Sequence, residues 1–261
     1  MKRIFQIAII AAFALMTLSF TAGDGVTLRL HPQKDKVYTI TSKTTQTTTM
    51  KVQGQSIRSN QTVDARQIFR AKEVSSDKNV FVTKIEAVKM TVSSMGMNLT
   101  YDSEHPENNS PMLTDQAYEI DRIINKPVYV TFDKLGYNTN PDDVETNQLG
   151  NVIIELPEEE LHEGSQWNYV KSQSVSDVDV NVNMTYTVTK ISKKSVDVSF
   201  TGTIDAKDIS GTYNGTSTID LQTGIIMAST INNSLSMTVL EQGFEIPMTI
   251  TGTSTITVKE Q

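Results

Sequence analysis

Residues 177–188, DVDVNVNMTYTV, alternate without a break between polar and apolar side chains. The apolar positions are Val178, Val180, Val182, Met184, Tyr186 and Val188. A period of two predicts a β-strand with one buried face and one face in water. The run exceeds the usual strand length of about 5–6 residues. It therefore favours a long, curled antiparallel sheet over a small compact sandwich.

The same alternation recurs along the chain, in which threonine occurs 34 times and combines with valine and isoleucine. These residue types are enriched in strands. Polar turns such as residues 220–224, DLQTG, join the alternating segments and predict hairpins. We predict a mainly β fold, a long curled antiparallel sheet that forms an open or half barrel, with a β-sandwich as the alternative. Further strands are predicted at residues 26–30, 37–52, 64–74, 80–92, 97–101, 128–132, 167–174, 196–204, 212–219, 225–239, 244–251 and 254–258.

One or two short helices are predicted in the middle of the chain. Ser110 is a capping residue and Pro111 suits the first helical position, so a helix is expected over residues 111–125. Its apolar face would comprise Leu113, Ala117, Ile120 and Ile124. A second start signal at residues 140–143, NPDD, with Gly150 as a stop, predicts another helix there.

The first 23 residues have the features of an export signal. Lys2 and Arg3 precede an apolar run, and Thr21, Ala22 and Gly23 supply small residues for cleavage. The chain has no cysteine, which excludes a lipid-modified N-terminus and favours a bacterial periplasm or exterior over a disulfide-rich secretory route. We expect residues 1–23 to be a signal peptide and the rest to have no transmembrane segment.

The remainder, residues 24–261, is expected to form a single antiparallel β-domain. Two phrases recur, KEVS at residues 72–75 with TKIS at 189–192, and MTV at 90–92 with MTV at 237–239. They suggest two related β units, at about 24–138 and 165–261, with a helical insert at 110–151. Repeated hairpin chemistry alone is the alternative explanation.

The net charge and the sequence motifs argue against several classes of function. Without Lys2 and Arg3 the chain has 21 basic and 30 acidic residues, a net charge of −9, so nucleic acid is not an expected partner. Nucleophile-elbow, zinc-pair, Walker and dinucleotide motifs are absent from the sequence. The histidines are His31, His105 and His162, and none lies in a metal-ligand spacing. We predict no catalytic residue, no metal ligand and no cofactor, and hence no enzyme.

Three residues are candidates for contact with a ligand. Trp167 and Tyr169 alternate along one predicted strand, so one sheet face could present both rings, and Met184 belongs to the apolar face of the next strand. Methionine is abundant, and its adaptable side chain suits an apolar cavity as well as an irregular core. Burial in the core is therefore the alternative interpretation for all three residues.

Several phrases together resemble a family of uncharacterised exported β-rich bacterial proteins, a domain-of-unknown-function family. They include LRL at residues 28–30, KVY at 36–38, LP at 156–157 and GSQW at 164–167, with Phe132, Asp133, Gly136, Asp220 and Gly224. Many members of such families carry a lipobox cysteine, and this chain lacks it. More distantly, a curled sheet with helices across it is similar in architecture to periplasmic lipoprotein-carrier half-barrels. The resemblance implies no activity and transfers no catalytic residue.

Two functions remain open at this point. In the first, an exported non-catalytic β-domain holds a lipid-like or other apolar ligand beneath the helix at residues 111–125. In the second, the chain is a structural or protein-interaction module of the bacterial envelope without a ligand cavity. A pocket would favour the first function and a filled core the second.

Overall fold

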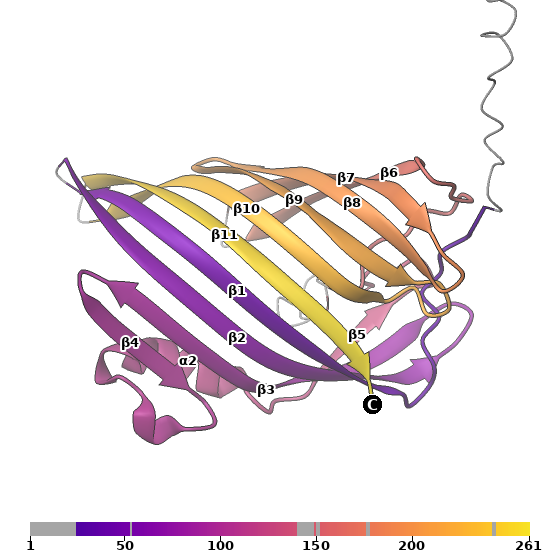
Figure 1. The fold of residues 1–261 in the computed structure, drawn as a ribbon, viewed down its shortest axis with the longest axis horizontal. Helices are drawn as coiled ribbons and strands as arrows, with labels where there is room; N and C mark the ends of the chain where they lie inside the picture. Colours follow the sequence, from indigo (N-terminus) through magenta and orange to yellow (C-terminus); the bar gives the residue numbers. More distant parts are fainter. Residues whose placement is uncertain (1–24, 53, 140–148, 150–151, 176–177, 242–243) are drawn as a thin grey trace, which may run out of the picture.

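The computed structural model describes residues 25–52, 54–139, 149, 152–175, 178–241 and 244–261. Within them the chain forms one antiparallel sheet of eleven strands and one α-helix (Figure 1). The helix α2 spans Thr114–Ile123, and 3-10 turns lie at Pro106–Asn108 and Pro111–Leu113. The strands are β1 Val37–Val52, β2 Gln55–Val74, β3 Asn79–Ser94, β4 Met97–Asp102, β5 Val128–Phe132, β6 Gln166–Val175, β7 Val178–Ile191, β8 Ser195–Ala206, β9 Ile209–Asp220, β10 Ile226–Glu241 and β11 Phe244–Glu260.

The strand order is β4-β3-β2-β1-β11-β10-β9-β8-β7-β6, with β5 paired to the other end of β3. The first and last strands pair with each other, from Tyr38 opposite Glu260 to Met50 opposite Met248. The sheet curls strongly without closing, and its two outermost strands, β4 and β6, are separated (Figure 1). The predicted fold class, a long curled antiparallel sheet forming an open barrel, is confirmed.

Most strand predictions are confirmed, and those for β1 and β5 match at both ends. Three are corrected. The predicted strand at residues 26–30 is an irregular segment in which only Val26 makes a β-bridge, to Leu161. The predicted strands at 244–251 and 254–258 are one strand, β11, because Gly252 stays in register with both of its neighbours. β2 starts at Gln55 rather than residue 64, because β1 provides a hydrogen-bonding partner along that whole length.

The two ends of the curled sheet differ. At one end the strand pairs are joined by two-residue connections, as in Ser94 opposite Met97. Met95 and Gly96 both have positive φ, 49° and 79°, as a type I′ hairpin requires. At the other end the connections are longer, and two further segments cover the end of the sheet. We call this the plugged end.

The end plug consists of residues 25–36, 133–139, 149 and 152–165. Its first segment pairs with its last through Val26 and Leu161, whose backbone groups exchange hydrogen bonds of 2.8 and 2.7 Å. The Arg29 guanidinium donates to the carbonyls of Pro157, at 3.0 Å, and Glu158, at 2.9 Å. The side chains that fill this end are almost fully buried: Leu28, Leu30, Leu149, Val152, Ile153, Leu156 and Leu161. The plug thus closes one end with hydrophobic burial and a buried backbone that is largely hydrogen-bonded.

The two faces of the sheet have opposite character. On the convex face, one row of register partners crosses ten strands and contains only threonine and asparagine: Asn168, Thr185, Thr201, Asn214, Asn232, Thr253, Thr45, Thr62, Thr91 and Thr100. Hydrogen bonds link neighbours within the row, such as Thr185 Oγ1 to Asn168 Oδ1 at 2.8 Å. The abundance of threonine therefore reflects a water-facing surface rather than a core.

Glycines on the concave face allow the strands to curl. They also leave room for large side chains of neighbouring strands to pack over them. A Cβ on Gly215 would lie 2.5 Å from Cζ of Phe200, whose ring covers this glycine from the adjacent strand. An aromatic ring packed over a cross-strand glycine is a recognised device in strongly bent sheets. Gly202, Gly211 and Gly252 are similarly crowded by atoms of neighbouring strands.

The helix covers only the β2–β4 part of the concave face. Its predicted apolar residues Leu113, Ala117, Ile120 and Ile124 pack against a cluster centred on Tyr101, which confirms the predicted face. Ser110 does not cap the helix, contrary to prediction; its Oγ accepts a 2.9 Å hydrogen bond from the Thr100 backbone N–H instead. The second predicted helix, at residues 140–150, lies almost wholly outside the described residues.

The buried Tyr38 and Tyr101 hydroxyls provide a matched test of this packing. Tyr38 Oη has no hydrogen-bond partner among the described residues, whereas Tyr101 Oη donates to Asp121 at 2.6 Å. We expect Tyr38→Phe to leave the free energy of unfolding unchanged or raise it by about 1 kcal/mol, and Tyr101→Phe to lower it by about 1 kcal/mol. Urea unfolding at neutral pH measures both. Equal destabilisation by the two substitutions would contradict the assignment.

Stability should fall at alkaline pH. Burial, followed by Glu260 and Asp220, raises the pKa of Tyr38 to about 12, against about 10 in an unfolded chain. The folded state thus retains a proton that the unfolded state loses, so this contribution is complete below pH 10 and disappears as the pH approaches 12. Unfolding free energies measured between pH 9 and about 11 should decline, and the decline should be shallower in Tyr38→Phe.

Gly215→Ala should destabilise the protein by about 1–3 kcal/mol, because the added methyl group meets both the Phe200 ring and the Thr230 carbonyl. Thr216→Ala, on the exposed face one residue away, is the control and should change stability by about 0.5 kcal/mol or less. Thermal unfolding of the two variants makes the comparison. A Gly215→Ala protein as stable as the control would show that the close approach is not required.

Candidate functional site

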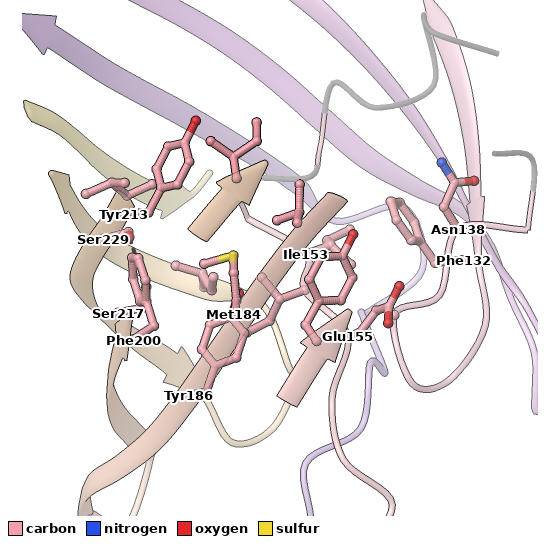
Figure 2. Close-up of a pocket in the computed structure, with 17 residues that line it drawn as sticks. Phe132, Asn138, Ile153, Glu155, Met184, Tyr186, Phe200, Tyr213, Ser217 and Ser229 are labelled. Atoms are coloured by element: carbon pink, nitrogen blue, oxygen red, sulfur yellow. Dashed lines mark hydrogen bonds between the residues drawn. The ribbon is translucent and has the colours of Figure 1, made fainter. Parts of the chain in front are cut away.

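A cavity of about 440 Å³ lies between the concave face of β6–β10 and the end plug (Figure 2). Phe132, Asn138 and Glu155 approach it from one side, while Tyr213, Phe200 and Met184 lie on the other (Figure 2). The full lining is Phe132, Gly136, Asn138, Ile153, Ile154, Glu155, Tyr169, Val182, Met184, Tyr186, Phe200, Ile204, Tyr213, Ser217, Ile226, Ser229 and Ile231. A volume of this size is within the range of about 300–1,000 Å³ typical of small-molecule sites.

Aromatic rings form much of the sheet side of the cavity. Tyr186 packs between Trp167, stacked at 4.9 Å between ring centroids, and Phe200, tilted at 5.7 Å. Tyr169 and Tyr213 complete the set from β6 and β9. The rings are held by neighbouring strands in register, so the wall is rigid rather than built on loops.

The three residues predicted to contact a ligand lie close together in the structure, but they do not all line the cavity. Tyr169 and Met184 are cross-strand partners and both line the cavity. Trp167 is the cross-strand partner of Tyr186 on the same face, beside the cavity and not in its lining; its ring stacks on Tyr186 and its Nε1 donates to the Glu155 carbonyl at 3.1 Å. Whether any of the three touches a ligand remains a prediction.

Sequence reasoning missed most of the wall. Phe200 and Tyr213 come from strands whose alternation was recognised, but alternation does not tell which strands lie opposite one another. Ser217 and Ser229 gave no signal, because serine in a strand is ordinarily read as water-facing. Here both are buried, and their hydroxyls lie 2.9 Å apart in the cavity lining.

The phenols of the cavity stay neutral over a wide pH range. Burial, with a smaller effect of the Glu155 carboxylate, raises the pKa of Tyr169 to about 12. The pKa of Tyr186 is raised by burial first, then by Tyr169 and Glu155, and that of Tyr213 by burial. At neutral pH these hydroxyls are therefore hydrogen-bonding groups and not anions.

Beyond the cavity, toward the open end, the concave face carries further apolar side chains after an interruption at Asn233 and Gly252. Leu235 and Ile250 face each other across β10 and β11 on the same concave face and are only partly buried. Met50, Met237 and Met248 follow them toward the hairpins, also partly buried. On the same face, Thr44 of β1 bonds Ser254 of the adjacent strand β11. The interior therefore offers apolar side chains interrupted by polar ones.

The other predicted features lie away from the cavity. The helix, expected above the ligand, lies over β2–β4, and none of its residues lines the cavity. His31, His105 and His162 are exposed, and His105 Nδ1 is 3.4 Å from a Glu107 carboxylate oxygen. Among the described residues, no three His, Asp or Glu side chains gather as metal ligands would.

In the part of the chain that the structure describes, no helix is long and apolar enough to span a membrane. The predicted signal peptide, residues 1–23, lies outside that part.

The solved structures to which this chain is similar include two from bacteria. An outer membrane channel from Pseudomonas putida F1 aligns over 91% of this chain and 98% of its own, with 10% sequence identity and a TM-score of 0.28. The translocator domain of the autotransporter NalP from Neisseria meningitidis aligns over 97% of both chains, with 8% identity and a TM-score of 0.24. No curated protein matches the chain.

A protein-family model does match. Residues 138–226 fit the family described as "Family of unknown function (DUF6263)". This segment includes the LP, GSQW, Asp220 and Gly224 features on which the resemblance rested, as well as Glu155, Tyr169, Met184, Phe200 and Tyr213 of the cavity. The resemblance to a domain-of-unknown-function family is thus confirmed over residues 138–226, which supply most of the cavity wall and much of the plug that faces it.

Proposed function

We propose that this chain is an exported, non-catalytic binding protein that holds an apolar or amphipathic small molecule inside its curled sheet. The observation that carries the proposal is the cavity of about 440 Å³, walled by aromatic and aliphatic side chains, with further partly exposed apolar side chains toward the open end. Concave apolar pockets with a few polar groups are the usual form of small-molecule sites. A module that uses only its surface has no need of such an internal space.

Two further observations support an exported carrier. Residues 1–23 carry the expected export signal. The convex face presents threonine and asparagine rows, opposite to the apolar outer band that a lipid-facing sheet requires. The outer face therefore suits water, and the apolar surface is directed inward, where it is available to a ligand.

The polar groups of the cavity support binding rather than catalysis. Ser217 Oγ is bonded to Ser229 Oγ, and neither is paired with a histidine, lysine or carboxylate in the described residues. A serine nucleophile requires an adjacent base. The hydroxyl pair and Asn138 can instead satisfy a polar group of a bound molecule.

The proposal predicts binding of 1-N-phenylnaphthylamine, a neutral apolar dye, with a saturable rise in its fluorescence. Trp167 is the lone tryptophan and stacks on the cavity residue Tyr186, so excitation of Trp167 should transfer energy to the bound dye. Ile231→Phe, which enlarges a side chain of the lining, should weaken dye binding about tenfold, a loss of about 1.4 kcal/mol.

Thr230→Phe is the matched control, since it adds the same side chain one residue away on the exposed face. This variant should bind the dye like the parent protein, and thermal unfolding would establish that both variants are folded. Absence of saturable binding to the parent, or equal binding by the two variants, would refute a ligand in this cavity.

A further inference from the structure

The described part of the cavity lining carries one acidic side chain, that of Glu155. No lysine, arginine or histidine is among the described lining residues. Five rings, Phe132, Tyr169, Tyr186, Phe200 and Tyr213, share the lining with this carboxylate. An aromatic wall with a single carboxylate is an environment that attracts a cation, because ring faces and carboxylate are both negative.

Glu155 is held in place by its surroundings. Its backbone carbonyl accepts the Trp167 indole N–H at 3.1 Å, and the next residue, Leu156, donates its backbone N–H to Leu135 at 2.7 Å. Ile153 and Leu156 are buried on either side of it. The residue itself is half-buried, so its negative charge is presented at a fixed site with reduced access to water.

The carboxylate and the rings face the same space. Glu155 lines the same cavity as Tyr186, Met184 and Phe200, and Figure 2 shows its carboxylate on the side of Phe132 and Asn138. Its field reaches the phenols, since Glu155 contributes to the raised pKa of Tyr169 and Tyr186. Those phenols remain neutral, so they add no competing charge and their ring faces stay available for cation–π contact.

We propose that the cavity selects a cationic amphiphile, an amine or quaternary ammonium joined to an apolar body, with Glu155 as the counter-charge and the aromatic wall around the cation. This inference rests on the proposed function. An anionic head group of the same size is disfavoured, because it would lie near Glu155 without a basic partner in the lining. The apolar body would extend along Leu235 and Ile250 toward the open end.

The test compares dodecyltrimethylammonium with dodecyl sulfate, which share a chain and differ in the sign of the head group. Both are titrated below their micelle-forming concentrations into protein carrying 1-N-phenylnaphthylamine, and displacement of the dye is measured. We expect the cation to bind at least about tenfold more tightly than the anion. Glu155→Gln should remove that preference, and Glu155→Asp should retain it.

Glu158→Gln is the control, because it removes the same charge from an exposed position of the same plug segment. It should leave the preference for the cation unchanged. Equal affinity of the parent protein for the two probes, or equal effects of Glu155→Gln and Glu158→Gln, would overturn the inference while leaving dye binding intact. If neither the dye nor either probe binds, the proposed function itself fails.

Discussion

The pairing of the first strand with the last is the constraint on which the rest of the structure depends. Strands β1–β4 and β6–β11 are two meanders, each connected by hairpins, and the β1–β11 ladder joins them into one sheet. An up-and-down barrel would close through the same kind of pairing. Here the first and last strands, β1 and β11, lie in the interior of the sheet. Its outermost strands are therefore β4 and β6, and the opening lies between them, where the middle of the chain leaves the sheet. The helix and most of the plug come from that middle segment, and the remaining plug segment, residues 25–36, precedes β1.

This arrangement determines where apolar surface remains uncovered. The plug fills one end, and α2 covers the β2–β4 part of the concave face, which leaves the β6–β10 part without a helix of its own. Burial of that remaining surface would contribute about 25 cal/mol for each Å² removed from water. A bound apolar molecule can supply the missing cover, and the register of β6–β10 has already fixed the shape it would meet.

Alternation along the chain was sufficient to predict the fold class and most strands, because each strand has one wet and one apolar face. It identified β1 and β5 at both ends and the apolar face of α2. It could not predict the cavity, because Phe200, Tyr213 and Ser229 meet only through the long-range register of separate strands. Tyr169 and Met184 were candidates because alternation within single strands placed Tyr169 with Trp167 and Met184 on an apolar face. The part of the sheet that the helix covers could not be predicted for a similar reason: its sequence defines an apolar face but not the strands that receive it.

Register shifts distort the sheet locally at the plugged end. β2 and β3 shift between Ala71 and Glu73, and β7 and β8 shift between Val188 and Lys190, in each case just before a turn at the plugged end. A β-bulge adds a residue to one strand and increases its bend and twist. The two bulges fall on the repeated phrases KEVS and TKIS, so the similarity of those phrases has a structural counterpart whether it arose by duplication or by shared hairpin chemistry.

Bending at this end brings the two meanders around the plug. Farther along, the inward glycines Gly202, Gly211 and Gly252 let the strands curl without filling the hollow. The cavity thus lies beside the bent end of the sheet, against the plug, and Leu235 and Ile250 lie on the same concave face farther toward the open end.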